Sequence, residues 1–171
     1  DSWFRGLGAE ESAGQFTVEL PQGWQTVETP VQFPVCKGRT PAWVQYVQSR
    51  RLEMTCGEAP FLASRYDAAT GEMIPVARRI GILDRKLRVV SENAATEDEW
   101  RKYATHAVQS TYGYEYQGDN LLLARVNLLL TYAEHLQARW QRKPTKEELQ
   151  PIATIISWNL WQMDGLRLSC L

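Results

Sequence analysis

Short apolar segments that suit β-strands alternate with longer segments of helical periodicity from residue 50 onward. Such alternation favours an α/β architecture, because a crossover between two parallel strands usually contains a helix. We therefore predict an α/β fold whose mostly parallel sheet is flanked by helices. The strands are expected at 52–55, 114–116 and 159–163, and the helices at 76–90, 97–110, 120–140 and 146–157.

Capping residues mark the starts of three of these helices. Thr96 is followed by Glu99, and Thr145 by Glu148, which is the spacing of a capping box. Asp119 is expected to cap the next helix, because its carboxylate can accept a hydrogen bond from a free backbone N–H of the first turn.

The segment between the first strand and the first long helix has a weaker pattern. Residues 61–67 are a candidate helix start, and 67–71 has the composition of a turn. Apolar residues then recur at spacings of three and four, which predicts an amphipathic helix over 76–90. These residues are Val76, Ile80, Leu83, Leu87 and Val90.

The first fifty residues differ from the rest in composition. Residues 1–42 are rich in Gly, Pro, Gln and Thr, and prolines at positions 21, 30, 34 and 41 interrupt any helix. We predict an extended arm over residues 1–50, with short edge strands at 16–20 and 31–35, that covers a hydrophobic face. The α/β domain is then expected over residues 51–171.

Charge limits the class of partner. Lys and Arg number 19 and Asp and Glu 20, so the net charge of −1 excludes both a strongly basic nucleic-acid binder and an acidic DNA mimic. Contact with DNA would have to be local, and the predicted helix 76–90 carries a basic face. Its members are Arg78, Arg79, Arg85, Lys86 and Arg88. The alternative is a solvated helix face without a ligand.

Other compositional features narrow the setting. Seven Trp and seven Tyr are many for 171 residues and suit either a core or a binding surface. Three cysteines (Cys36, Cys56 and Cys170) without paired spacing favour a reducing, cytoplasmic environment over a disulfide framework. No zinc-type spacing occurs, so no metal is expected. The longest apolar run, 121–124, is too short for a bilayer, no signal peptide is visible, and a start at Asp1 suggests a trimmed chain.

Three segments carry candidate chemistry. In the first, the predicted strand at 52–55 contains Glu53 and runs into Cys56-Gly57, followed by Phe61. A glycine in a tight turn after a strand lets the backbone approach a ligand closely. The alternative is an ordinary strand–turn–helix connection.

The other two segments each place an acid at the end of a predicted strand. Glu115 lies in Tyr114-Glu115-Tyr116, before a helix that contains Ala124 and Asn127. An acid in this place can accept hydrogen bonds from ribose hydroxyls, or it can cap a backbone turn. Asp164 follows the third strand, where the alternative is a common Asp-Gly turn.

Taken in order, the three segments resemble the first three motifs of class I S-adenosylmethionine-dependent methyltransferases. The string from Glu53 to Asp67, together with Trp161-Gln-Met-Asp164, is similar to adenine-specific methylase subunits of bacterial restriction systems over residues 51–166. The resemblance implies a Rossmann-type sheet and the cofactor S-adenosylmethionine. It also implies that Glu115 binds the ribose and Asp164 the adenine amino group. The implied cofactor-binding residues are Glu53, Cys56, Gly57, Phe61, Glu115 and Asp164.

The catalytic motif of that family, Asn/Asp-Pro-Pro-Tyr/Phe, does not occur in these 171 residues. The resemblance therefore implies a partial methyltransferase that binds cofactor and DNA and needs a second protein chain for catalysis. No catalytic residue is assigned, and this chain alone is not expected to act as an enzyme. The alternative is a phage-encoded inhibitor of a host defence nuclease, of the anti-restriction or anti-CRISPR kind, built on a degenerate methyltransferase scaffold.

Overall fold

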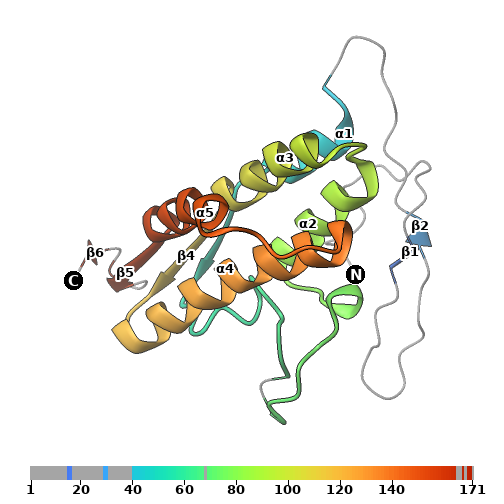
Figure 1. The fold of residues 1–171 in the computed structure, drawn as a ribbon. Coiled ribbons are helices and arrows are strands. Elements are labelled where there is room, and N and C mark those ends of the chain that lie inside the picture. Colours follow the sequence, from blue (N-terminus) through green and yellow to red (C-terminus); the bar gives the residue numbers. More distant parts are fainter. Residues whose placement is uncertain are drawn as a thin grey trace. The chain divides into compact units, whose positions relative to one another are not determined.

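The computed structural model describes residues 15–16, 29–30, 40–67, 69–164, 167 and 169–170, in two compact units, Asp1–Gln45 and Tyr46–Leu171 (Figure 1). In the first unit, strand β1 (Gln15–Phe16) pairs antiparallel with β2 (Thr29–Pro30). The remainder of the predicted strands 16–20 and 31–35 lies outside the described residues. Helix α1 (Ala42–Gln48) spans the junction, a helix that the sequence did not predict.

The second unit contains one small sheet. Its strands are β3 (Arg51–Met54), β4 (Thr111–Glu115), β5 (Leu160–Asp164) and β6 (Ser169–Cys170), in that spatial order. β3, β4 and β5 are parallel, whereas β6 runs antiparallel to β5. The prediction of an α/β fold with a parallel sheet is confirmed, and the three predicted strands are direct neighbours.

Four α-helices of the described residues lie wholly within this unit. They are α2 (Ile82–Asn93), α3 (Glu97–Gln109), α4 (Gly118–Trp140) and α5 (Lys146–Asn159), preceded by the 3-10 turn η1 (Val76–Arg78). Thr96 and Thr145 accept the N–H groups of Glu99 and Glu148, as predicted. The N-cap of α4 is Gln117, so the prediction of an Asp119 cap is wrong.

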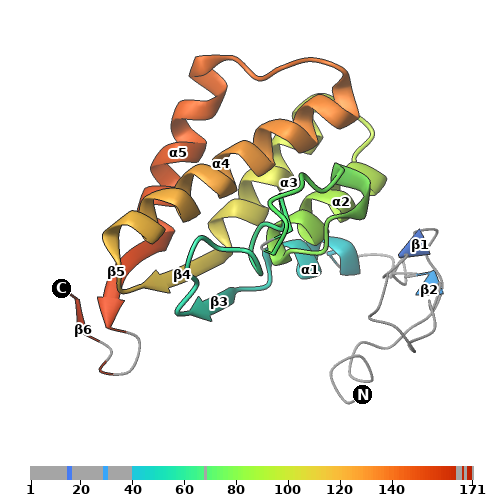
Figure 2. The same ribbon diagram turned by 90° about the horizontal axis from the view of Figure 1, so that it is seen from below.

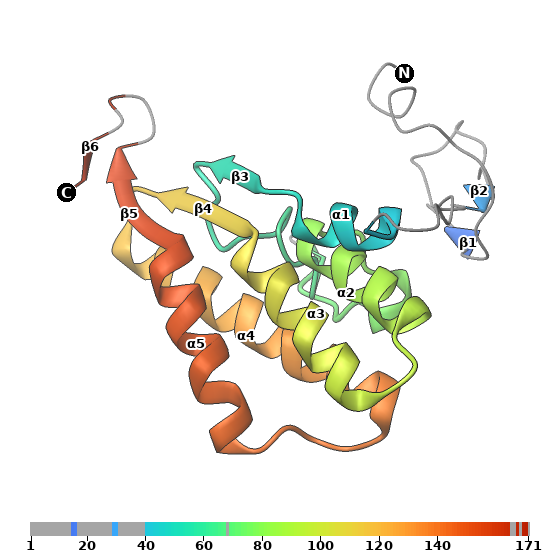
Figure 3. The same ribbon diagram turned by 90° about the horizontal axis from the view of Figure 1, so that it is seen from above.

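The strands continue the helices that precede them. Only Ser110 separates α3 from β4, and α5 passes into β5 with no intervening residue. In Figures 2 and 3, α3 and β4 run in the same direction, and so do α5 and β5. The strands lie together at one end of the helices, and α4 runs in the opposite direction to α3 and α5. Each parallel crossover thus consists of two helices, of which the second leads directly into the next strand.

The predicted helix 76–90 is wrong in its first half. Ile80 and Gly81 donate their N–H groups to Ser64 Oγ, at 2.8 and 2.9 Å, and α2 begins only at Ile82. A Cβ at position 81 would lie 2.7 Å from the carbonyl oxygen of Leu62, so the two backbone segments are in direct contact. This contact between distant segments overrides the local periodicity. Residues 61–67 form turns and extended chain rather than a helix.

The prediction of a basic face on this helix is also wrong, because two of its five residues are buried. Arg79 is 3% exposed and binds Glu134 at 2.5 Å and the carbonyl oxygen of Ile74 at 2.8 Å. Lys86 is 1% exposed. Arg88 donates to the carbonyl oxygens of Ala77 and Arg79. These cations stabilise backbone carbonyls and a carboxylate of the protein itself, so the five basic residues do not form one solvent-facing surface.

Lys86 fastens the amino ends of the strands. Its ammonium group donates to the carbonyl oxygen of Ser49 at 2.6 Å, and to the carbonyl and hydroxyl oxygens of Ser110 at 3.1 and 2.6 Å. Ser49 precedes β3 and Ser110 precedes β4, and the N–H of Arg51 donates to Ser110 as well. Burial lowers the pKa of Lys86 to about 7, with a smaller effect from the positive charge of Arg51.

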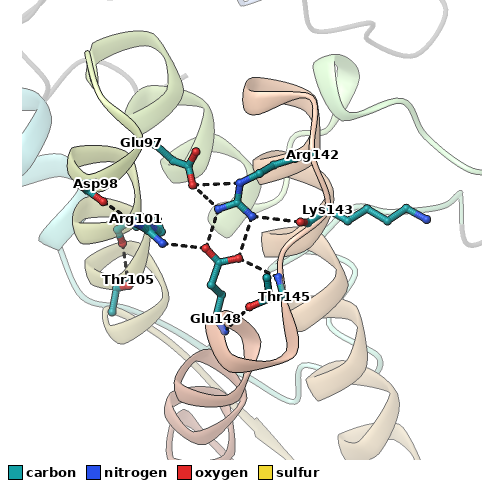
Figure 4. A network of polar contacts seen from close by, with 8 residues as sticks. All are labelled: Glu97, Asp98, Arg101, Thr105, Arg142, Lys143, Thr145 and Glu148. Carbon is teal, nitrogen blue, oxygen red and sulfur yellow. Dashed lines mark hydrogen bonds and ion pairs between the residues drawn. The ribbon is translucent and has the colours of Figure 1, made fainter.

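An ion-pair network lies at the ends of the helices that are remote from the sheet (Figure 4). Arg142, after α4, forms a two-pronged pair with Glu148 of α5 at 2.6 and 2.9 Å and also binds Glu97 of α3. Arg101 reaches Glu148 from α3 at 2.8 Å. The Arg142 hydrogen bonds lower the pKa of Glu148 to about 2. The network connects three helices, although its exposure limits its contribution to stability.

We expect Lys86→Met to lower the free energy of unfolding by about 1–3 kcal/mol, because buried oxygens lose a donor. Between about pH 7 and 10.5 the unfolded chain binds more protons at Lys86 than the folded chain. Wild-type stability should therefore rise with pH in this window, and the variant should lose that slope. Urea unfolding at several pH values measures both effects. Lys102→Met, at an exposed position of α3, is the control. Equal stabilities of the two variants would contradict the assigned role.

Candidate functional site

The carboxyl ends of β3 and β4 are joined by one side chain. Glu115, 7% exposed at the end of β4, accepts the N–H of Gly57 at Oε2 (2.7 Å) and the N–H of Gln117 at Oε1 (3.0 Å). The N–H of Cys56 donates to the carbonyl oxygen of Tyr114 at 2.8 Å and prolongs the β3–β4 pairing. The two predicted site segments therefore meet at one carboxylate, as their parallel pairing requires.

The chain after β3 makes the predicted tight turn. Thr55, Gly57 and Ala59 have φ angles of 67°, 56° and 66°, and the N–H of Ala59 donates to the carbonyl oxygen of Cys56 at 2.8 Å. This left-handed backbone is easily adopted by glycine and is unfavourable for the other two residues. A Cβ at position 57 would have no heavy atom within 4 Å. The backbone angle at position 57 thus favours glycine, and Gly57 borders open space.

Cys56 is a packing residue in this arrangement. Burial raises the pKa of its thiol to about 12, and the negative charges of Glu115 and Glu53 add to the effect. The thiol therefore stays protonated and is a poor nucleophile at neutral pH. A Cβ at Gly113, on β4, would lie 2.9 Å from its sulfur and 3.1 Å from Leu62 Cδ1. Close packing of this turn on the sheet is the reason for a glycine within β4.

Glu53 is the least satisfied group of the site. It lies on β3 beside Gly113, and its Oε2 is buried without a hydrogen-bond partner in the described part of the chain. Burial raises the pKa of its carboxyl group. A buried acceptor without a donor costs free energy and would be stabilised by a ligand that donates a hydrogen bond.

The remaining predicted site residues lie further out. Gln162 pairs with Glu115 across β4 and β5, and Asp164 follows two residues later at the same edge of the sheet. Asp164 accepts the N–H of Arg167 at 3.1 Å, as in the turn that the sequence left as an alternative. Phe61 is 73% exposed. The structure thus brings together Glu53, Cys56, Gly57 and Glu115, with Asp164 along the same edge and Phe61 on the surface.

A polar clamp holds the turn against α4, and the sequence did not assign it. Asn127 donates from Nδ2 to the carbonyl oxygen of Glu58 at 2.9 Å and accepts from Arg65 at 3.1 Å. Arg65 also pairs with Glu134 at 2.6 Å. The sequence contained one indication of this role, because Asn127 belongs to the predicted helix that follows Glu115 in the second motif. The clamp thus holds the turn through Glu58, the residue after the one that Glu115 binds.

A second buried cluster contains Ser64, Asp84 and His135, residue types that occur together in hydrolases. Here Asp84 lies between the other two. It accepts the N–H of Ser64 at 2.8 Å and lies 3.0 Å from His135 Nε2, while Ser64 Oγ accepts two backbone N–H groups. A nucleophilic serine would need the histidine as its direct base. The hydrogen bonds of this cluster therefore hold the 61–81 segment against α2 and α4.

Two surface hollows lie elsewhere on the second unit. One, of about 360 Å³, is lined by Arg125, Ser157, Trp158, Trp161 and Gln162. The other, of about 350 Å³, is lined by Gln48, Arg50, His106, Gln109, Ser110 and Tyr112, at the amino ends of β3 and β4. Neither includes Glu53, Gly57 or Glu115.

Comparison with known proteins returns no family model, no curated protein and no solved structure that matches this chain. The described residues contain no group of three or more His, Cys, Asp or Glu side chains that could hold one metal ion. None of the helices described is both long and apolar enough to cross a membrane.

We expect Gly113→Ala to lower the free energy of unfolding by about 1–3 kcal/mol, because the new methyl group overlaps the Cys56 sulfur. Cys56→Ala removes that sulfur, so the double variant should lose less than the sum of the two single losses. Denaturant unfolding of the four proteins measures this coupling. Gly118→Ala, whose Cβ would meet Gln162 at 3.6 Å, is the control and should be nearly neutral. Additive losses would show that Cys56 does not pack against Gly113.

Proposed function

We propose that this chain is the cofactor-binding part of an adenine-specific DNA methyltransferase-like protein. It binds S-adenosylmethionine at the carboxyl ends of β3 and β4. The observation that carries the proposal is the pair of hydrogen bonds from Gly57 and Gln117 to the Glu115 carboxylate. The hydrogen bond from Gly57 joins the glycine turn of the first motif to Glu115, the acid of the second motif. Ligands of open α/β sheets bind at this end of the strands.

The order of the strands supports the same proposal. The three motifs lie on β3, β4 and β5, which are parallel neighbours in the order of the motifs. The Rossmann-type identity of the sheet is part of the proposal, as is the assignment of Asp164 to the adenine amino group.

The polar groups of the site suit this cofactor. Each Glu115 oxygen accepts one N–H, which leaves lone pairs for two ribose hydroxyls. The unpartnered Oε2 of Glu53 suits the ammonium group of the methionine portion. The open space beside Gly57 gives the ligand access to the turn. The bound cofactor supplies an electrophilic methyl group, and the residues of this chain hold and orient it.

The proposal assigns binding rather than catalysis to this chain. Transfer to an exocyclic amine requires a group that aligns the amine and accepts its hydrogen bonds, together with an aromatic ring against the extruded base. The Asn/Asp-Pro-Pro-Tyr/Phe motif provides both, and it is not within these 171 residues. DNA and a second protein chain are the proposed partners.

Titration calorimetry with S-adenosylmethionine tests the proposal. We expect wild-type protein to bind and Glu115→Gln to lose about 1.5–3 kcal/mol of binding free energy, because a charged acceptor of hydrogen bonds is replaced. Glu53→Gln should also weaken binding, whereas Glu72→Gln, at an exposed acid of the 61–81 segment, should not.

Thermal melting of each variant separates lost binding from lost folding. Failure of the folded wild-type protein to bind would contradict the proposal. It would favour the alternative of a nuclease inhibitor that acts through its surface alone. Equal affinities of the Glu115 and Glu72 variants would contradict the role of Glu115.

A further inference from the structure

The hollow beside β5 presents two indole rings to solvent. Trp158, in the last turn of α5, is 68% exposed, and Trp161, on β5, is 41% exposed. Their ring centroids lie 6.3 Å apart with 54° between the planes. The indole N–H of Trp161 donates to the carbonyl oxygen of Trp158, which orients that ring. Large aromatic surfaces held open to water are typical of binding sites rather than of a core.

Arg125 of α4 supplies a positive charge with unused hydrogen-bonding capacity. Its Nη2 donates to the carbonyl oxygens of Leu160 and Ser157 at 2.8 and 3.4 Å, which holds the guanidinium at the hollow. Its Nε is buried without a partner, and both hydrogen bonds of the guanidinium to the described residues come from Nη2. Arg125 is the one charged residue among those that line the hollow, so the site favours an anion.

Gln162 completes the polar lining. Its Nε2 donates to the carbonyl oxygen of Tyr116 at 3.1 Å, which leaves the side-chain oxygen as an acceptor. The hollow thus combines stacking surfaces, one cation and one amide oxygen, within about 360 Å³.

We propose that this hollow binds one nucleotide of a single-stranded nucleic acid, with the base against Trp158 and the phosphate on Arg125. Aromatic side chains bind unpaired bases by stacking, and the planar guanidinium suits phosphate oxygens. The hollow does not include the Glu115 carboxylate, although Gln162 pairs with Glu115 across β4 and β5. It would give the proposed DNA partner a contact that the predicted basic face cannot provide, since Arg79 and Lys86 are buried. The inference does not depend on cofactor binding.

Fluorescence anisotropy with a labelled oligothymidylate tests the site. We expect Trp158→Ala to weaken binding roughly tenfold and Trp158→Phe to retain most of it, because a smaller ring still stacks. Arg125→Met should weaken binding and reduce the slope of log K against log salt by about 1, the value expected for the loss of one phosphate contact. Leu123→Ala, at an exposed residue of α4 outside the hollow, should bind like the wild type.

Two further measurements define the ligand and the independence of the site. An abasic oligonucleotide should bind more weakly to the wild type, and the Trp158→Ala variant should not distinguish it from oligothymidylate. Free thymidine monophosphate should compete with oligothymidylate for the wild type, because the hollow holds one nucleotide, and lack of competition would contradict the proposal. Added S-adenosylmethionine should leave the affinity for oligothymidylate unchanged, so failure of the cofactor proposal would not affect this result. Unaltered affinity in both the Trp158→Ala and Arg125→Met variants, or no binding by the wild type, would overturn the proposal.

Discussion

The Glu115 carboxylate is the interaction on which the site and its surroundings depend. One oxygen takes the N–H of the turn after β3 and the other takes the N–H that precedes α4. Charge-assisted hydrogen bonds to backbone N–H groups are stronger than neutral ones, and this carboxylate is largely shielded from water. It therefore fixes the end of β4, the start of α4 and the position of Gly57 together. Asn127 then holds the same turn from within α4, through the carbonyl oxygen of Glu58.

The short parallel strands are held at both ends. β3 has four residues and β4 has five, so their pairing alone is limited. At the amino ends, Lys86 binds the carbonyl groups that precede both strands. The helices bury an apolar core between them, in which the ring centroids of Trp100 of α3 and Tyr132 of α4 lie 5.5 Å apart. The helices thus supply most of the buried apolar surface, and the polar ties at the strand ends fix the sheet relative to them.

The sequence was informative where the signals are local. Thr96 and Thr145 marked helix starts correctly, since a cap involves residues only three positions apart. The sequence also predicted the parallel strands, from the alternation of strands and helices. The sequence-based prediction was wrong where the local structure depends on contacts between segments distant in sequence. Ser64 Oγ accepts the N–H groups of residues 80 and 81, and these hydrogen bonds interrupt the predicted helix.

The candidate site shows the same division. Glu115 and Gly57 were singled out because Glu115 lies at the end of one predicted strand and Gly57 in the turn after another, and the parallel pairing of those strands brings them together. Arg79 and Lys86 were expected on the surface because cations usually are, yet their partners lie on segments remote in sequence. The exposure of Trp158 and Trp161 could not be predicted either, since a tryptophan count does not distinguish a core from a surface.

The central claim is that the Glu115 carboxylate presents the Gly57 turn to S-adenosylmethionine. The most direct measurement is a titration of the labelled protein with this compound, followed in the amide ¹H–¹⁵N spectrum. We expect the Gly57 and Gln117 amide signals to shift together and saturate at one affinity, and Glu115→Gln to move the midpoint of the titration to a higher concentration of the compound. Unchanged signals of Gly57 and Gln117 in a folded, saturated sample, or shifts confined to residues remote from the ends of β3 and β4, would contradict it.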